Sequence, residues 1–168
     1  MKVELKNVKF SEHMSEETNA FTADVYVDGK KCGYAKNDGH GGCTNVQAYG
    51  DPGLYGIMQM AENYLRTQPD INIGTEAKPF MVKSNFENVV DQLFEQWLQN
   101  KEVKKFEKKM VNHLMWGIPA GTSYTQMRFV KPLNQIDRDI LQQFLDKYKK
   151  TFKEGEKYLN TNLVGFDL

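Results

Sequence analysis

The sequence predicts an α+β fold, in which an antiparallel sheet built from the N-terminal strands is packed by about three amphipathic helices. Strand periodicity is concentrated near the N-terminus and helical periodicity dominates later. No regular alternation of strands and helices indicates a parallel sheet. No linker, repeat or low-complexity tract interrupts the 168 residues, so we expect a single domain over 1–168.

The first two strands are indicated by alternating apolar and polar side chains. Over 21–27 the alternation is strict, which is the period of a half-buried strand. Over 3–10 the same period occurs in two pieces, and its phase slips by one residue near Asn7, as a β-bulge allows. The polar residues between these runs, 11–19, are expected to form an exposed connection.

A tight hairpin should follow the second strand. Asp28-Gly29 supplies the positive φ angles that a type I′ turn needs, so a third strand is predicted over 30–36. A two-residue turn also fixes a register, which would place Cys32 on the apolar face. That register pairs position 27 with 30, Val25 with Cys32, and Ala23 with Tyr34.

A fourth strand is predicted over 43–49, after a glycine-rich loop, and a first helix should follow it. Asp51 before Pro52 is typical of an N-cap and a first helical turn. Apolar residues at helical spacing predict that this helix continues to about Thr67. The interval 69–83 is long and weakly patterned.

The clearest helix should begin at Ser84, which can form a capping box with Glu87. Apolar side chains then repeat every three or four residues up to Leu98. The next apolar series is displaced by five residues, which predicts a bend or break near Asn100. The helix also carries an acidic line, interpreted as a solvated face with a docking surface as the alternative: Glu87, Asp91 and Glu95.

The C-terminal part should contain a second hairpin and a third helix. The runs 114–118 and 124–130 flank a turn-forming segment, although the first run could also be helical. The tail 158–168 is either a loop or a short edge strand. Pro132 precedes a continuous apolar stripe that predicts the last amphipathic helix: Leu133, Ile136, Ile140, Phe144, Tyr148 and Phe152.

Composition and charge exclude several functional classes. Lys plus Arg number 22 and Asp plus Glu number 22, so no net field attracts nucleic acid or anionic membranes, and we expect no general nucleic-acid binding. No apolar run approaches the length of a membrane span or a signal-peptide core. We therefore expect a soluble, cytoplasmic protein without a membrane partner.

The softer metal ligands do not form a recognisable site. Two cysteines are too few for a disulfide framework or a complete cysteine zinc site. None of these ligands has the short paired spacing of a zinc knuckle or a helical histidine pair, so we expect no metal and no cofactor. They are His13, His40, His113, Cys32 and Cys43.

The most glycine-dense window is the candidate functional site. Asp38 and His40 place a carboxylate and an imidazole two residues apart, and Cys43 follows, so a general base or a nucleophile is available if these side chains meet. Alternatively, glycine N–H groups could form an anion-binding nest, or the window could be a simple turn with a solvated histidine. The window consists of Asn37, Asp38, Gly39, His40, Gly41 and Gly42.

Three segments resemble those of small uncharacterised proteins from bacteriophages and bacterial mobile elements. These segments are 15–18, the turn 25–30 and the window 37–42, and the likeness continues weakly into 84–98. That group has no function to transfer, so the resemblance implies a setting but no catalytic residue. Small phage-borne proteins often act on host machinery by binding, which favours a binding role by association.

We therefore expect a protein that is more a binder than an enzyme. In this hypothesis it binds a host protein, and can inhibit it, through the loop 37–43, the charged helices, or both. The alternative is a small hydrolase or a nucleotide-binding enzyme that uses Asp38 and His40.

Overall fold

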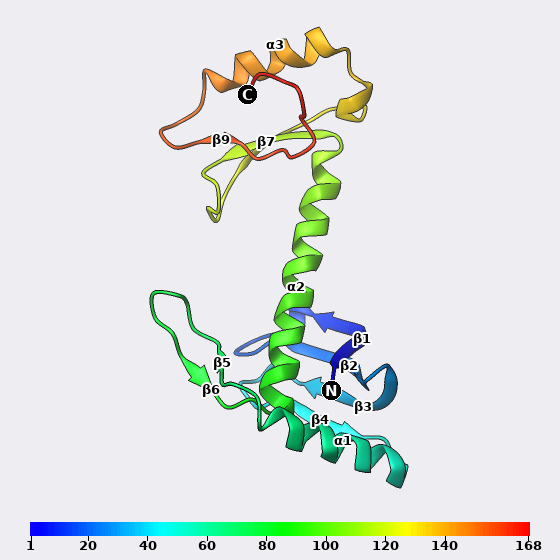
Figure 1. The fold of residues 1–168 in the computed structure, drawn as a ribbon. Helices are drawn as coiled ribbons and strands as arrows, with labels where there is room; N and C mark the ends of the chain where they lie inside the picture. Colours follow the sequence, from blue (N-terminus) through cyan, green and yellow to red (C-terminus); the bar gives the residue numbers. More distant parts are fainter. The chain divides into compact units, whose positions relative to one another are not determined.

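The computed structural model describes all 168 residues and confirms the α+β class, with three α-helices and an N-terminal four-stranded antiparallel sheet (Figure 1). The sequence predicts one domain because it contains no linker. In the structure, the residues group into two compact units, Met1–Gln99 and Asn100–Leu168, which are described separately below. No helix combines the length and the apolar character needed to cross a bilayer.

The main sheet has the strand order β1-β2-β3-β4, and every neighbouring pair is antiparallel. The predicted bulge in the first strand is confirmed, because the β1–β2 register shifts between Lys6 and Lys9 and Asn7 has a φ of 52°. Short 3₁₀ helices lie at Glu12–Met14 and Leu133–Gln135. The strands are β1 (Val3–Ser11), β2 (Ala20–Val27), β3 (Lys30–Asn37) and β4 (Asn45–Ala48).

The β2–β3 turn has the predicted geometry, since Asp28 and Gly29 have φ angles of 48° and 82°. The predicted register is wrong beyond the first two pairs. A bulge lies between Tyr26 and Val25, so that Val25 faces Gly33 and, further along, Ala23 faces Ala35. Cys32 is the extra residue of this bulge, and its side chain is nevertheless fully buried, as predicted.

Helix α1 (Pro52–Leu65) begins as predicted, because the Asp51 carboxylate accepts a hydrogen bond from the Leu54 N–H. It ends two residues before the predicted end at Thr67. The weakly patterned interval that follows contains a small hairpin, formed by β5 (Ile71–Asn72) and β6 (Met81–Val82).

Helix α2 (Phe86–Met110) differs from the prediction at two points. Asn85 caps it in place of Ser84, since the Asn85 side-chain oxygen accepts from the Asn88 N–H. The helix also continues through Asn100, where the sequence predicts a bend or break. The local sequence contains no Gly or Pro, and a change in the phase of an apolar stripe does not by itself interrupt backbone hydrogen bonds.

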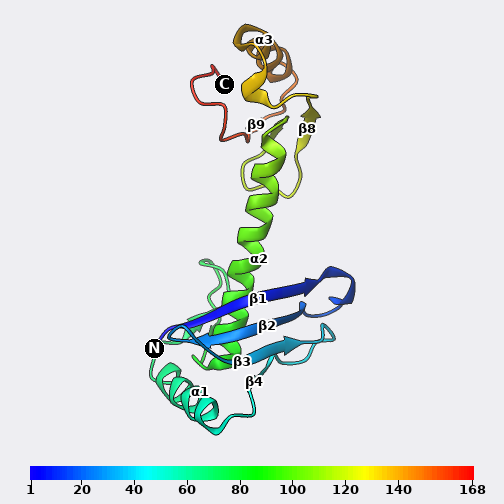
Figure 2. The ribbon, with the colours of Figure 1, turned by 90° about the vertical axis from the view of Figure 1, so that its right-hand side faces the viewer.

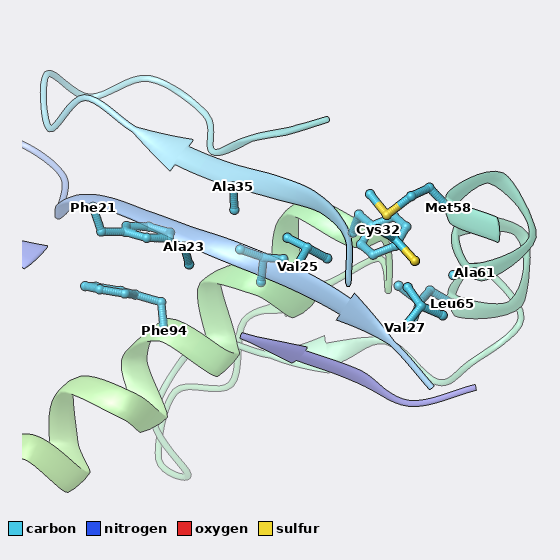
Figure 3. Close-up of a cluster of buried hydrophobic side chains, with 12 residues drawn as sticks. Phe21, Ala23, Val25, Val27, Cys32, Ala35, Met58, Ala61, Leu65 and Phe94 are labelled. Atoms are coloured by element: carbon cyan, nitrogen blue, oxygen red, sulfur yellow. The ribbon is translucent and has the colours of Figure 1, made fainter. Parts of the chain in front are cut away.

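Both helices cover one face of the main sheet and close its core. Figure 3 shows α1 contributing Met58, Ala61 and Leu65 near Val27, while Phe94 of α2 lies against Phe21. The two phenyl rings stack with centroids 4.0 Å apart, and Phe94 is 1% exposed. The predicted packing of this helix on the first strands is therefore confirmed.

The second unit contains the predicted second hairpin, β7 (His113–Gly117) and β8 (Thr125–Arg128), so the run 114–118 is a strand. An edge strand, β9 (Lys157–Tyr158), completes the order β8-β7-β9, and the tail after Tyr158 contains no further strand. Helix α3 (Arg138–Lys149) begins only after its N-cap at Asp137.

The apolar stripe predicted for the last helix is partly wrong. The 3₁₀ turn before α3 resets the helical phase, so the most deeply buried side chains of α3 are Leu141 and Leu145. Ile140, which was assigned to the stripe, is 49% exposed.

Candidate functional site

The backbone of the glycine-rich loop is held by the side chain of Asn37, the last residue of β3. Its Oδ1 accepts hydrogen bonds from the Thr18 hydroxyl and the Gly39 N–H, both at 2.9 Å. Its Nδ2 donates to the Gly42 carbonyl at 3.0 Å and to the Thr44 hydroxyl at 3.1 Å. Because Asn37 is 9% exposed, these four bonds satisfy a buried amide and tie both ends of the loop to one side chain.

Gly39 attaches the loop to the connection between β1 and β2. Its carbonyl accepts the N–H groups of Glu16, Glu17 and Thr18 at 3.0, 3.0 and 3.2 Å. Gly39 has a φ of 89°, and a Cβ atom there would lie 2.1 Å from the Met14 carbonyl oxygen, so only glycine fits. The concave set of N–H groups in this region therefore binds the protein's own carbonyl oxygen.

The N–H groups of Gly39 and Gly41 also have partners inside the protein. The Gly39 N–H is bound to Asn37, and the Gly41 N–H donates to the Thr18 hydroxyl at 3.3 Å. In this conformation, neither of these groups is directed at an external anion.

Asp38 and His40 project into solvent and have separate partners. The Asp38 carboxylate pairs with the Lys36 ammonium at 2.8 Å, and the His40 Nδ1 lies 3.1 Å from a Glu16 carboxylate oxygen. No hydrogen bond joins Asp38 to His40. Both side chains are more than 60% exposed, so these pairs contribute little to stability.

Cys43 lies at the end of the loop as an exposed free thiol. A hydrogen bond to Glu87, together with the negative charges of Glu87 and Asp91, raises the pKa of the Cys43 thiol. An elevated pKa keeps the sulfur protonated near neutral pH, which is the opposite of what a thiolate nucleophile requires. Cys43 has no hydrogen bond to His40.

The acidic line of α2 faces this loop: Glu87 and Asp91 are half-buried, whereas Glu95 is exposed, as the interpretation of a solvated face predicts. The Thr44 hydroxyl donates to Asp91 at 2.5 Å, and the Asn19 amide donates to Glu95 at 2.8 Å. A hollow of about 360 Å³ separates the loop from this side of α2. In the sequence, Asp91 directly follows Val90 of the apolar stripe. This adjacency was the one sequence signal that the acidic line borders the core.

Burial raises the pKa of Asp91, and the neighbouring charges of Glu87 and Glu95 raise it further, while the bond from Thr44 lowers it. The folded protein therefore binds a proton at Asp91 more readily than the unfolded chain does. At pH values above the pKa of Asp91 in the folded protein, the ionised carboxylate therefore lowers the free energy of unfolding. This destabilisation disappears as the pH falls below the usual pKa of 3.8.

Replacing Asp91 with Asn is thus expected to raise the melting temperature at pH 7, because the amide oxygen still accepts from Thr44 and no charge is buried. The gain should shrink as the pH is lowered towards 4. Thermal unfolding at several pH values measures this difference, with Glu107→Gln on the exposed face of α2 as the matched control. A lower melting temperature for Asp91→Asn at pH 7 would contradict the assignment.

The histidine, cysteine and carboxylate side chains do not converge into a metal centre. No group of three or more such residues has a geometry that could hold a metal ion. Cys32 lies in the core of the first unit, while Cys43 is near carboxylates that are already hydrogen-bonded to the loop.

Comparisons with known proteins add no further assignment. No protein-family model matches the chain, and searches of curated proteins and of solved structures also find no match.

Proposed function

We propose that this chain is a non-enzymatic interaction protein that binds a host protein through the loop 37–43, and can inhibit that protein by occupying its surface. One observation carries the proposal: the loop backbone is fixed by internal hydrogen bonds, while the side chains of Asp38 and His40 remain exposed. A loop that is ordered before binding loses little conformational entropy when a partner docks.

The same geometry supports binding more than catalysis. The carboxylate beside the His40 Nδ1 is that of Glu16 and not Asp38, and because both of these side chains are more than 60% exposed, no buried carboxylate holds the imidazole in place as a general base. A phosphate site needs N–H groups that are free to donate, and the Gly39 and Gly41 N–H groups are bound internally. The hydrolase or nucleotide-binding alternative would require the loop to rearrange.

The phage or mobile-element setting rests on the resemblance of short segments. Two of them, 15–18 and 37–42, contact each other in the structure, because the Gly39 carbonyl binds three N–H groups of the other segment. The resemblance therefore covers one continuous structural feature and not two separated ones. A partner in the cytoplasm of a bacterial host follows from this setting.

Asp38→Ala combined with His40→Ala tests the proposal. Both side chains are exposed, so the melting temperature should stay nearly unchanged, while capture of the partner from host lysate should fall by about tenfold or more. The wild-type chain and the double variant are compared by quantitative mass spectrometry of the captured proteins.

The matched control removes another exposed ion pair, with Glu102→Ala and Lys105→Ala. This control should capture the same proteins as the wild type. Equal capture by the loop variant and the wild type would reject the loop as the binding surface.

A thermal-shift panel of nucleotides and metal ions tests the enzymatic alternative. A ligand at 100 times its dissociation constant stabilises the folded state by about 2.7 kcal/mol. A shift of this size that disappears in the Asp38/His40 double variant would favour the enzyme and overturn the proposed function.

A further inference from the structure

Strand β4 leaves one edge of the main sheet without a neighbour. The Tyr49 N–H donates to the Cys32 carbonyl at 3.0 Å, and this bond sets the alternation of the β3–β4 ladder. Residues 45, 47 and 49 direct their backbone groups towards β3, so Val46 and Ala48 direct theirs away from it. No protein group is bonded to the outward N–H and C=O groups of Val46 and Ala48.

A groove of about 740 Å³ lies along this edge. One wall is β4 itself, and the others are one side of α1 from Pro52 to its C-cap Arg66 and the start of α2, so the groove follows the strand from Thr44 to Tyr49. In Figure 2, α1 is beside β4 at this end of the sheet. The apolar part of the lining includes Pro52, Met58 and Tyr55, whose ring is 63% exposed.

The opposite edge of the sheet is protected against further strand pairing. Strand β1 carries the charged side chains Glu4, Lys6 and Lys9, and its bulge at Asn7 twists the strand. Charged residues and bulges are the usual devices that prevent an edge strand from pairing with another chain. Strand β4 has no charged residue and no bulge, so its edge lacks this protection.

The charged groups of the groove determine which strand it can accept. Three carboxylates, those of Asp51, Glu62 and Glu87, line it together with a single cation, Arg66. Arg66 is already paired with Glu62 at 2.6 Å. The groove therefore has a net charge of −2 and favours a segment that carries a Lys or Arg side chain.

We propose that the β4 edge binds an extended segment of a partner protein as a fifth strand, with a basic side chain of that segment directed at the carboxylates of the groove. Val46 and Ala48 each offer one donor and one acceptor, so the added strand gains up to four backbone hydrogen bonds. The proposal concerns a different surface from the loop 37–43, and either one can fail without the other.

A second copy of this chain is the competing occupant. Symmetric pairing of two β4 strands would bring together two grooves that each carry a net charge of −2, and the repulsion disfavours this arrangement. A basic extended segment has no such penalty.

The test uses a capped, fluorescent seven-residue peptide in which valine alternates with threonine and the central residue is arginine. Fluorescence anisotropy should show saturable binding, and a peptide with central glutamate should bind about fivefold more weakly or not at all. A third peptide, N-methylated at the nitrogens that would face β4, should lose binding because it cannot donate to Val46 and Ala48.

Amide hydrogen exchange locates the bound peptide. In the free protein the Val46 and Ala48 amides should exchange faster than those of Gln47 and Tyr49, and the arginine peptide should slow them selectively. If the Val46 and Ala48 amides become protected at high protein concentration without peptide, and sedimentation shows a dimer, then the β4 edge pairs with a second copy of the chain and the proposal is wrong. An absence of peptide binding, or protection confined to other residues, would overturn it.

Two variants of the protein complete the test. Val46→Pro removes an outward N–H without removing a ladder bond, and should weaken the arginine peptide about tenfold, whereas the control Thr22→Ser, at an exposed position of β2 outside the groove, should not. Asp51→Asn keeps an acceptor for the Leu54 N–H but removes a charge, so it should weaken the arginine peptide about two- to fivefold and leave a neutral peptide unaffected. Unchanged affinity for both variants would overturn the proposal even if Val46→Pro lowers stability.

Discussion

Replacing Phe94 with alanine is expected to destabilise the Met1–Gln99 unit by about 3 to 5 kcal/mol. Phe94 is 1% exposed and stacks on Phe21, and its ring also lies within 6 Å of the rings of Phe10 and Trp97. The substitution therefore removes a large buried surface and leaves a cavity between the sheet and α2, which the aromatic neighbours can fill only in part.

Urea unfolding followed by circular dichroism measures this loss. The matched control is Phe80→Ala, because the Phe80 ring is 63% exposed, and its removal should change the free energy of unfolding by less than about 0.5 kcal/mol. A loss below about 1 kcal/mol for Phe94→Ala would show that the apolar stripe of α2 does not close the core.

The parts of the fold that could be predicted are those that local sequence determines. Strict alternation over 21–27 predicts β2. Asp28-Gly29 predicts the turn, because few other residue pairs accept positive φ at two successive positions. The start of α1 was also predictable from two residues. The Asp51 side chain caps the helix, and the Pro52 ring fixes a φ angle that suits the first helical turn.

The errors lie where neighbouring residues compete for one role. Ser84 and Asn85 can both cap a helix, and tertiary contacts bury Ser84 while Asn85 caps α2. The predicted register was wrong from Val25 onward, because the bulge at Cys32 shifts the phase of β3 and places Ala35, not Tyr34, beside Ala23 in the core.

The candidate site was located by its glycines, but its structure depends on residues far away in sequence. Gly39 binds N–H groups of 16–18, and Thr44 binds Asp91, 47 residues further along the chain. Spacing within the loop could not show that Asp38 would pair with Lys36 and His40 with Glu16. Only the close approach at Gly39 explains why this window needs glycine at that position.

Asn37→Ala is expected to disorder the loop and to destabilise the first unit by about 2 to 3 kcal/mol. The substitution removes four hydrogen bonds at once and leaves the Gly39 N–H buried without an acceptor. If the exposed side chains of the loop recognise a partner, its capture should fall as far as in the Asp38/His40 double variant, although both recognition residues are intact. The reason is that the binding surface depends on a backbone conformation that Asn37 holds in place.

Hydrogen exchange at the Gly39 amide, read beside urea unfolding and partner capture, measures this effect. The exchange rate should rise sharply in Asn37→Ala and stay unchanged in the control Asn45→Ala, whose side chain is exposed and makes no hydrogen bond. Slow exchange at Gly39 in Asn37→Ala would mean that the bonds of Glu16, Glu17 and Thr18 to the Gly39 carbonyl suffice to order the loop. In that case Asn37 would contribute to stability alone, and the loop would keep its binding competence without it.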